Sequence, residues 1–168
     1  MHEDNVKSEA ELWELSVGED VFTRAEAIQE LGVRCLKKGQ HDVGLNFMNA
    51  ALDIWREQDD LLGIGRSCYS QGTFHLTHNR YEIAVPLLEE AVSSYHNAFH
   101  TIWEADALRA LGSAYMSLGL AGIAQEMFIR AAACYDEMDE YYRASLSEID
   151  LGNTYAGLFE LHMSLLSF

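Results

Sequence analysis

The amino-acid sequence predicts an all-α protein built from repeated pairs of antiparallel helices. Three observations indicate this fold. Residues that favour helices dominate the 168-residue chain, β-branched residues are sparse, and Pro86 is its single proline. Glycines recur at a fixed interval, and the apolar residues around them follow helical spacing. The hydrophobic fraction of 49% is large enough for a substantial core in a chain of this length.

The repeat is marked by four glycines that lie 40 residues apart, Gly32, Gly72, Gly112 and Gly152. Other positions keep the same register. Seven residues before each glycine the residue is small, in Ala25, Gly65, Ala105 and Ser145. Nineteen residues after it stands alanine in Ala51, Ala91 and Ala131, and twenty-three after it an aromatic residue in Trp55, Tyr95 and Tyr135. Agreement of so many positions in one register indicates an internal repeat.

Each repeat is predicted to be a hairpin of two helices, A and then B. The third repeat holds two apolar stripes of helical spacing, Ala105, Leu108, Gly112 and Tyr115, then Ala124, Phe128, Ala131 and Tyr135. Glycine or asparagine separates such stripes, at Gly39-Gln40, Asn79-Arg80 and Gly119-Leu120. A glycine inside a helix costs about 1 kcal/mol relative to alanine. We therefore expect the glycine of helix A to permit a close contact with helix B.

The predicted organisation is an acidic N-terminal segment, residues 1–20, followed by the repeats in residues 21–168. Three repeats are complete, at 21–60, 61–100 and 101–140, and in the partial fourth, 141–168, the second helix starts and is cut short. A capping box at Ser8–Glu11 opens a short helix. This helix either covers the first hairpin, or it occupies the groove or docks on a partner. The apolar end, residues 158–168, either folds back or pairs with a second copy, as a homodimer, or with another protein.

The third repeat resembles the tetratricopeptide repeat (TPR), on Leu111-Gly112, Tyr115, Gly119, Ala124, Phe128 and Ala131. The resemblance covers residues 21–168 and implies a right-handed superhelix of antiparallel helix hairpins, a TPR-like solenoid. Two family positions differ. The early tryptophan is replaced by Ile28, Cys68, Leu108 and Glu148, and the closing proline by Arg56, His96 and Asp136. The interval of 40 residues is similar to the long-helix variants of kinesin light chains and of bacterial peptide-sensing regulators.

The resemblance also implies a concave groove lined by the A helices, where a peptide or helix of a partner protein would bind. The candidate binding residues on this face are Lys37, Arg66, Tyr69, Thr73, Arg109, Ser113, Met116 and Asn153. The resemblance places Glu26, Gln29 and Val33 on the same face. Their hydroxyl and amide groups suit an extended peptide backbone, and the two arginines suit a carboxylate. The alternative is that both arginines pair with Asp106 and bind nothing else, because Arg109 follows that residue by three positions.

The charge of the chain disfavours some classes of partner. Eleven basic residues against 27 acidic ones give a formal net charge of -16. Such a negative field repels nucleic acid and acidic membrane surfaces. The charge either attracts a basic partner or keeps the protein in solution. The odd cysteine count, with Cys35, Cys68 and Cys134 at apolar positions, predicts buried free thiols in a reducing compartment. With no signal sequence and no apolar run of about 20 residues, we expect a cytoplasmic protein.

No catalytic, metal or cofactor site is predicted. The sequence holds no nucleophile elbow, phosphate loop or dinucleotide fingerprint. The histidine pairs His75/His78 and His96/His100 are expected at opposite ends of a hairpin, on the order of 20 Å apart, too far to share one ion. The sequence therefore predicts a non-catalytic protein–protein interaction module. Two alternatives remain open: a peptide-responsive regulatory domain, and a structural homo-oligomer that uses the apolar C-terminal end.

Overall fold

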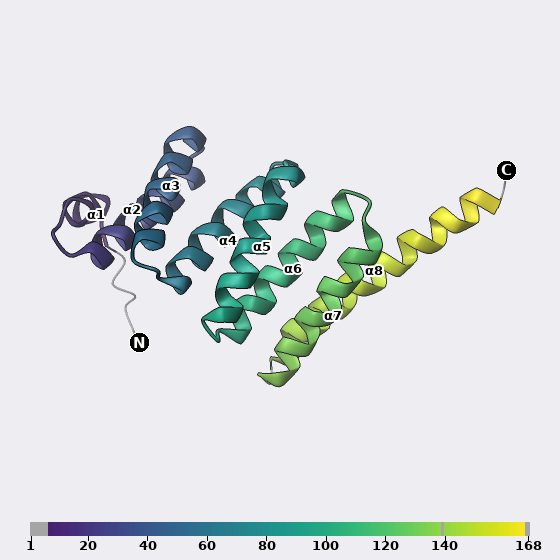
Figure 1. Ribbon diagram of the computed structural model, residues 1–168. Coiled ribbons are helices and arrows are strands. Elements are labelled where there is room, and N and C mark those ends of the chain that lie inside the picture. The colour runs from purple at the N-terminus through teal and green to yellow at the C-terminus, as the bar shows by residue number, and fades with distance from the viewer. Residues whose placement is uncertain (1–6, 139, 167–168) are drawn as a thin grey trace. The chain divides into compact units, whose positions relative to one another are not determined.

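The computed structural model describes residues 7–138 and 140–166, without the side chains of residue 141 and residues 158–166. This part of the chain is entirely helical (Figure 1). Its elements are α1 (Glu9–Ser16), α2 (Val21–Lys37), α3 (His41–Glu57), α4 (Leu61–Thr77), α5 (Tyr81–Asn97), α6 (Thr101–Ser117), α7 (Ala121–Glu137) and α8 (Tyr141–Leu166). The A helices of the hairpins are α2, α4 and α6, and the B helices are α3, α5 and α7. The chain forms two compact units, residues 1–70 and 71–168.

Residues in the left-handed backbone conformation make the turns. Between A and B helices they are Gly39, Asn79 and Gly119, with φ of 79°, 57° and 77°, as the sequence predicted. Between B and A helices Asp59 and Phe99 take this conformation, with φ of 51° and 56°. Asp59 is a residue type that tolerates this conformation, whereas Phe99 is strained in it and was not expected.

In residues 1–70, α1 covers the hairpin of α2 and α3. The predicted capping box is present, because Ser8 Oγ accepts from the amide of Glu11 and the Glu11 carboxylate accepts from the amide of Ser8. Leu12 is buried against Ala27 and Leu31. The Trp13 ring meets the edge of Phe47, with centroids 5.4 Å apart. Of the two sequence interpretations, a cover on the first hairpin is therefore the one the structure has.

Trp55 organises a second core cluster in this unit. Its side chain is 1% exposed and packs with Ala25 and Ala51. Gly63, in the first turn of α4, lies directly against the indole, since a Cβ there would come within 2.3 Å of a ring carbon. Gly63 therefore lets α4 approach the tryptophan closely.

Three of the four repeat glycines make the close contact that the sequence predicted. A Cβ on Gly32 would lie 2.9 Å from Met48 Cγ, one on Gly72 would lie 2.7 Å from Leu88 Cγ, and one on Gly112 would lie 2.7 Å from Phe128 Cε1. The expectation was wrong for Gly152, where a Cβ would meet no described atom within 4 Å. Gly152 is exposed on α8 and has no B helix opposite it.

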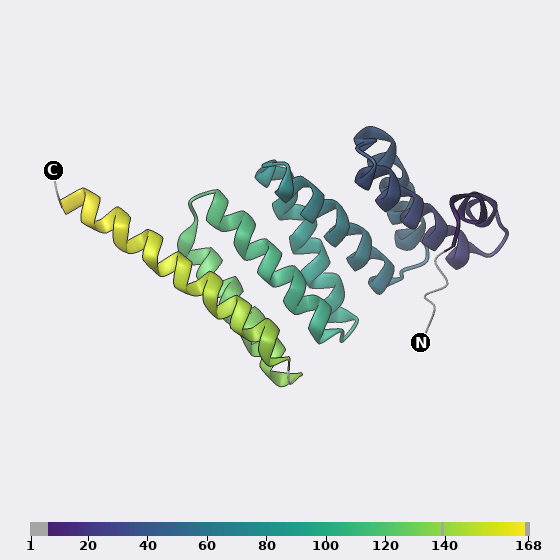
Figure 2. The ribbon, with the colours of Figure 1, turned by 180° about the vertical axis from the view of Figure 1, so that it is seen from behind.

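The fourth repeat is not the partial hairpin that we expected. In residues 71–168, α8 runs beside α7 and continues past it as one helix of 26 residues (Figure 2). The physical reason lies in the turn position. Where the other hairpins have Gly39, Asn79 and Gly119, the corresponding residue is Phe159, so this position lacks the glycine or asparagine that takes the left-handed conformation without strain. The side chains of residues 158–168 lie outside the described part, so the homodimer contact stays a prediction.

The glycine contacts lead to a paired prediction. Replacing Gly112 by leucine should lower the free energy of unfolding by about 3 kcal/mol, because the side chain would overlap the Phe128 ring. Replacing Gly152 by alanine should raise it by about 1 kcal/mol, because helix propensity improves and nothing obstructs the methyl group. Denaturant unfolding followed by circular dichroism measures both. Equal losses in the two variants would contradict the packing argument.

The strained turn gives a second prediction. Phe99 is 93% exposed and has positive φ, so its ring adds little packing while its backbone is strained. Phe99→Asn should raise the free energy of unfolding by about 1 kcal/mol, because asparagine tolerates this conformation. Phe99→Ala is the control, since it removes the ring and keeps the strain. A gain of the same size in the alanine variant would show that strain is not the cause.

Candidate functional site

A pocket of about 410 Å³ opens on the A-helix side of residues 1–70, and we call it the A-face pocket. Its lining residues are Lys7, Leu12, Glu26, Ala27, Gln29, Glu30, Val33, Arg34 and Arg66. They come from α1, α2 and the start of α4, with Lys7 just before α1. Four of these positions, Glu26, Gln29, Val33 and Arg66, are ones that the TPR resemblance placed on the binding face.

Arg66 is held loosely in this pocket. Its Nη2 atom lies 3.7 Å from Glu26 Oε1, and its guanidinium carbon lies 5.7 Å from the centre of the Trp55 ring. The side chain is 37% exposed, so the ion pair is strongly screened by solvent. Nε of Arg66 is buried and has no hydrogen-bond partner within the described residues. The terminal nitrogens of Arg66, whose contact with Glu26 is long, are suited to a bidentate carboxylate.

Gln29 fixes the back of the A-face pocket. Its Oε1 accepts hydrogen bonds from Trp55 Nε1 at 3.0 Å and from Ser67 Oγ at 3.2 Å. Because both donors belong to buried side chains, the amide is held in one orientation. Gln29 therefore ties α2, α3 and the start of α4 together beside Arg66.

The candidates in residues 71–168 are held differently. Arg109 Nε donates to Asp150 Oδ2 at 2.8 Å, and Ser113 Oγ donates to the carbonyl of Arg109 at 3.1 Å. Burial acts to lower the pKa of Arg109, but the hydrogen bond and charge of Asp150 outweigh it and raise that pKa. A ligand carboxylate at Arg109 would therefore have to displace Asp150.

The alternative that Arg109 pairs with Asp106 was wrong, because Arg109 pairs with Asp150. Asp106 accepts from Tyr135 Oη at 2.6 Å and from Arg143 Nη1 at 2.8 Å. These partners lie 29 and 37 residues away along the chain, and the sequence argument considered only a neighbour within one helix.

The eight candidate residues fall into two groups. Lys37, Arg66 and Tyr69 belong to residues 1–70, and Thr73, Arg109, Ser113, Met116 and Asn153 belong to residues 71–168. All eight are at least partly accessible, and Arg66 lines a described pocket. The shared groove across all A helices stays a prediction.

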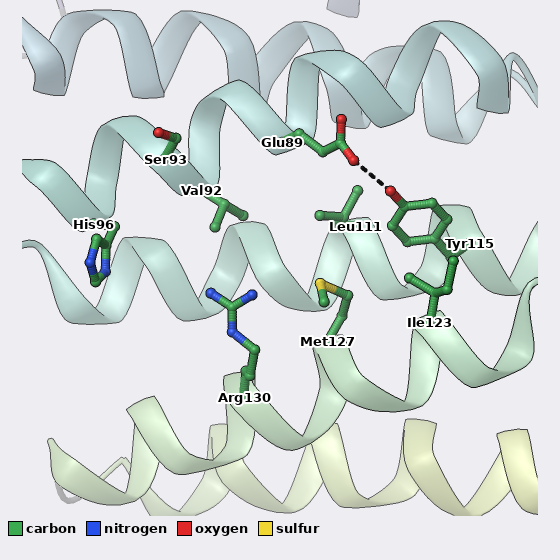
Figure 3. A pocket seen from close by; sticks show the side chains of 9 residues that line it. All are labelled: Glu89, Val92, Ser93, His96, Leu111, Tyr115, Ile123, Met127 and Arg130. Carbon is green, nitrogen blue, oxygen red and sulfur yellow. Dashed lines mark hydrogen bonds between the residues drawn. The ribbon is translucent and has the colours of Figure 1, made fainter.

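A second pocket, which sequence reasoning missed, lies on the B-helix side of residues 71–168 (Figure 3). We call it the B-face groove. Its volume is about 360 Å³, and its lining residues are Glu89, Val92, Ser93, His96, Leu111, Tyr115, Ile123, Met127 and Arg130. Val92 and Met127 are apolar at positions outside the two stripes that predict the contact within a hairpin. That was the available signal, and the sequence argument considered only the A-helix face.

The predicted histidine pairs lie apart within residues 71–168. His78 Nδ1 is 2.8 Å from the carbonyl of Phe74, and His96 Nδ1 is 3.1 Å from Glu104 Oε2. The described residues hold no group of three or more His, Cys, Asp or Glu side chains arranged to bind a metal ion. Across the same residues, no helix combines the length and hydropathy that a membrane crossing requires.

Comparison with known proteins identifies the fold. Neither a family model nor a curated protein matches the sequence. Two solved mutants of MamA, an all-helical TPR-like protein, are similar in structure. The double mutant "MamA RS-1 ArsTM" has a TM-score of 0.57 at 16% sequence identity, over 89% of this chain and 84% of that chain. A second mutant has a TM-score of 0.54 at 19% identity, over 87% and 85%.

The fold is that of a TPR-like helical-hairpin solenoid. This confirms the predicted all-α class. At such low identity the likeness to MamA concerns the fold alone. The assignment to a long-period variant of the repeat stays a prediction.

The hydrogen bonds of Gln29 give a third prediction. Gln29→Leu should lower the free energy of unfolding by about 2 kcal/mol, because it leaves the buried Trp55 indole N–H and the Ser67 hydroxyl without their acceptor. Gln29→Glu keeps an acceptor oxygen and should lose less than half as much. Urea unfolding followed by circular dichroism compares the two, and equal losses would contradict this role.

Proposed function

We propose that the protein is a non-catalytic protein–protein interaction module that binds an acidic peptide segment of a partner in the A-face pocket. The observation that carries the proposal is the loosely held Arg66 in a pocket lined by the predicted binding positions. The TPR-like fold supports a role in protein binding in general.

The charge around the pocket favours an acidic ligand. Lys7, Arg34 and Arg66 line it against Glu26 and Glu30, which leaves one positive charge locally in a chain of net charge -16. Arg34 Nε is occupied by Glu30 Oε1 at 2.8 Å, whereas the Arg66–Glu26 contact is long and exposed. Arg66 is thus the cation that a carboxylate from a partner would engage with least competition.

The walls of the pocket suit a peptide rather than a free ion. Leu12, Ala27 and Val33 supply apolar surface for a side chain beside the cations. Gln29, with its oxygen already occupied by two donors, would offer its amide nitrogen to a peptide carbonyl. An acidic side chain or a C-terminal carboxylate next to an apolar residue therefore fits best.

Two further points belong to the proposal. All three cysteines are free thiols, two of them buried, which supports a reducing compartment such as the cytoplasm.

A second candidate function, a homo-oligomer that pairs through α8, is favoured by the exposed side chains of Tyr142 and Ile149 on that helix.

The test is a peptide-display selection against the full chain, followed by fluorescence-anisotropy titration of the selected peptides. Arg66→Ala should weaken binding about tenfold or more, and Arg66→Lys should restore only part of it, because lysine lacks the planar fork. Affinity should also fall with added salt. The matched control is Arg24→Ala, another arginine of this unit outside the pocket lining.

Arg109→Ala tests the wider groove. If the peptide also reaches residues 71–168, this variant should weaken binding in addition to Arg66→Ala. Selected peptides that show no excess of acidic residues, or that bind Arg66→Ala as tightly as the wild type, would overturn the proposal.

A further inference from the structure

The B-face groove is built from three consecutive helices of one unit. α5 supplies Glu89, Val92, Ser93 and His96, α6 supplies Leu111 and Tyr115, and α7 supplies Ile123, Met127 and Arg130. Val92, Leu111 and Met127 form an apolar middle, and Ile123 is 42% exposed beside them. An apolar surface of this kind, with polar groups at its ends, is typical of a binding site.

The two ends differ in charge. Figure 3 shows Glu89 and Tyr115 at one end with Ile123, and His96 at the other end. Tyr115 Oη donates to Glu89 Oε1 at 2.5 Å, and this bond, with burial, raises the pKa of Tyr115 to about 12. The Glu89 side chain is exposed and keeps the rest of its acceptor capacity for a ligand.

A buried acid, Glu104, lies near the cation of the groove, Arg130. Glu104 is 8% exposed, and its carboxylate lies 3.1 Å from His96 Nδ1 and 3.8 Å from Arg130 Nη2. Arg130 therefore offsets Glu104, and Glu89 sets the remaining charge of the lining. Counted together with Glu104, the carboxylates and the arginine at the groove leave one net negative charge.

Size and charge decide the occupant. Glu89 and His96 are separated by seven residues of one helix, so the groove is about 10 Å long, which equals about two helical turns. Two apolar side chains of a helix at positions i and i+7 are also about 10 Å apart and span this length. A second copy of this chain is a poor occupant of this groove, because its sequence has 27 acidic residues and only 11 basic ones to pair with Glu89.

We propose that the B-face groove binds a basic amphipathic helix of a partner protein. The apolar side chains of that helix fill the space over Val92, Leu111 and Met127, and a lysine or arginine beside them pairs with Glu89. This site is distinct from the A-face pocket in its residues and in the charge of its ligand. It does not depend on the function proposed above.

The probe is a synthetic 18-residue helical peptide with leucine along one face and lysine on the other. A matched peptide carries glutamate in place of every lysine. Fluorescein-labelled peptides are titrated with the full chain at physiological salt. The lysine peptide should bind at least tenfold more tightly than the glutamate peptide. Equal or tighter binding of the glutamate peptide would overturn the proposal.

Groove variants separate specific binding from general attraction to an acidic protein. Ser93 is exposed and lines the groove. Ser93→Trp should therefore fill the groove and lower the affinity for the lysine peptide at least tenfold. Ala133→Trp is the control. Ala133 is an exposed residue of α7 that holds the same repeat position as Ser93, 40 residues later, and it does not line the groove. Circular dichroism verifies that both variants fold. The same affinity in both would overturn the proposal.

Glu89 is tested against an acid on the same helix. Glu89→Gln should lower the affinity for the lysine peptide about fivefold and make that affinity less sensitive to salt. Glu82→Gln, which removes an exposed charge outside the groove, should change the affinity less than twofold. Equal losses of affinity in the two variants would mean that only the net charge of the chain attracts the peptide, and would overturn the proposal.

Discussion

The contact between a glycine on each A helix and a large side chain on its B helix is the constraint on which this structure depends. Gly32 against Met48, Gly72 against Leu88 and Gly112 against Phe128 bring the two helices of a hairpin together. Each glycine costs helical stability, and the close packing of the neighbouring side chain offsets that cost. Where the contact is absent, at Gly152, the hairpin is absent too, and α8 continues as a single helix.

This pairing also determines which surfaces remain for binding. A helix that packs one side against its hairpin partner keeps another side accessible to neighbouring hairpins and to ligands. In residues 1–70 the A-helix side carries Arg66 and further cations in a pocket. In residues 71–168 the B-helix side carries an apolar groove with Glu89 at one end. The two sites proposed for this acidic chain would thus bind ligands of opposite charge.

Much of the fold could be predicted from the sequence, because helix periodicity and turn residues act locally. The turns at Gly39, Asn79 and Gly119 fall where glycine and asparagine predicted them. The turn at Phe99 could not be predicted, since the demands of the flanking helices override the preference of the residue. The partners of Arg109 and Asp106 lie 29 to 41 residues away, so their ion pairs depend on packing between helices. The B-face groove likewise arises where three helices meet, and no single stripe of residues encodes it.

The turn at Phe99 has a consequence for proteolysis. A nearly fully exposed aromatic residue in a tight turn is the kind of site that a chymotrypsin-like protease cleaves first, because loop tips fit an extended active site with little unfolding. A cut after Phe99 would separate α5 from α6 and α7, and these are the helices that together form the B-face groove. The covalent continuity of one strained turn therefore keeps the two sides of that groove in a single molecule.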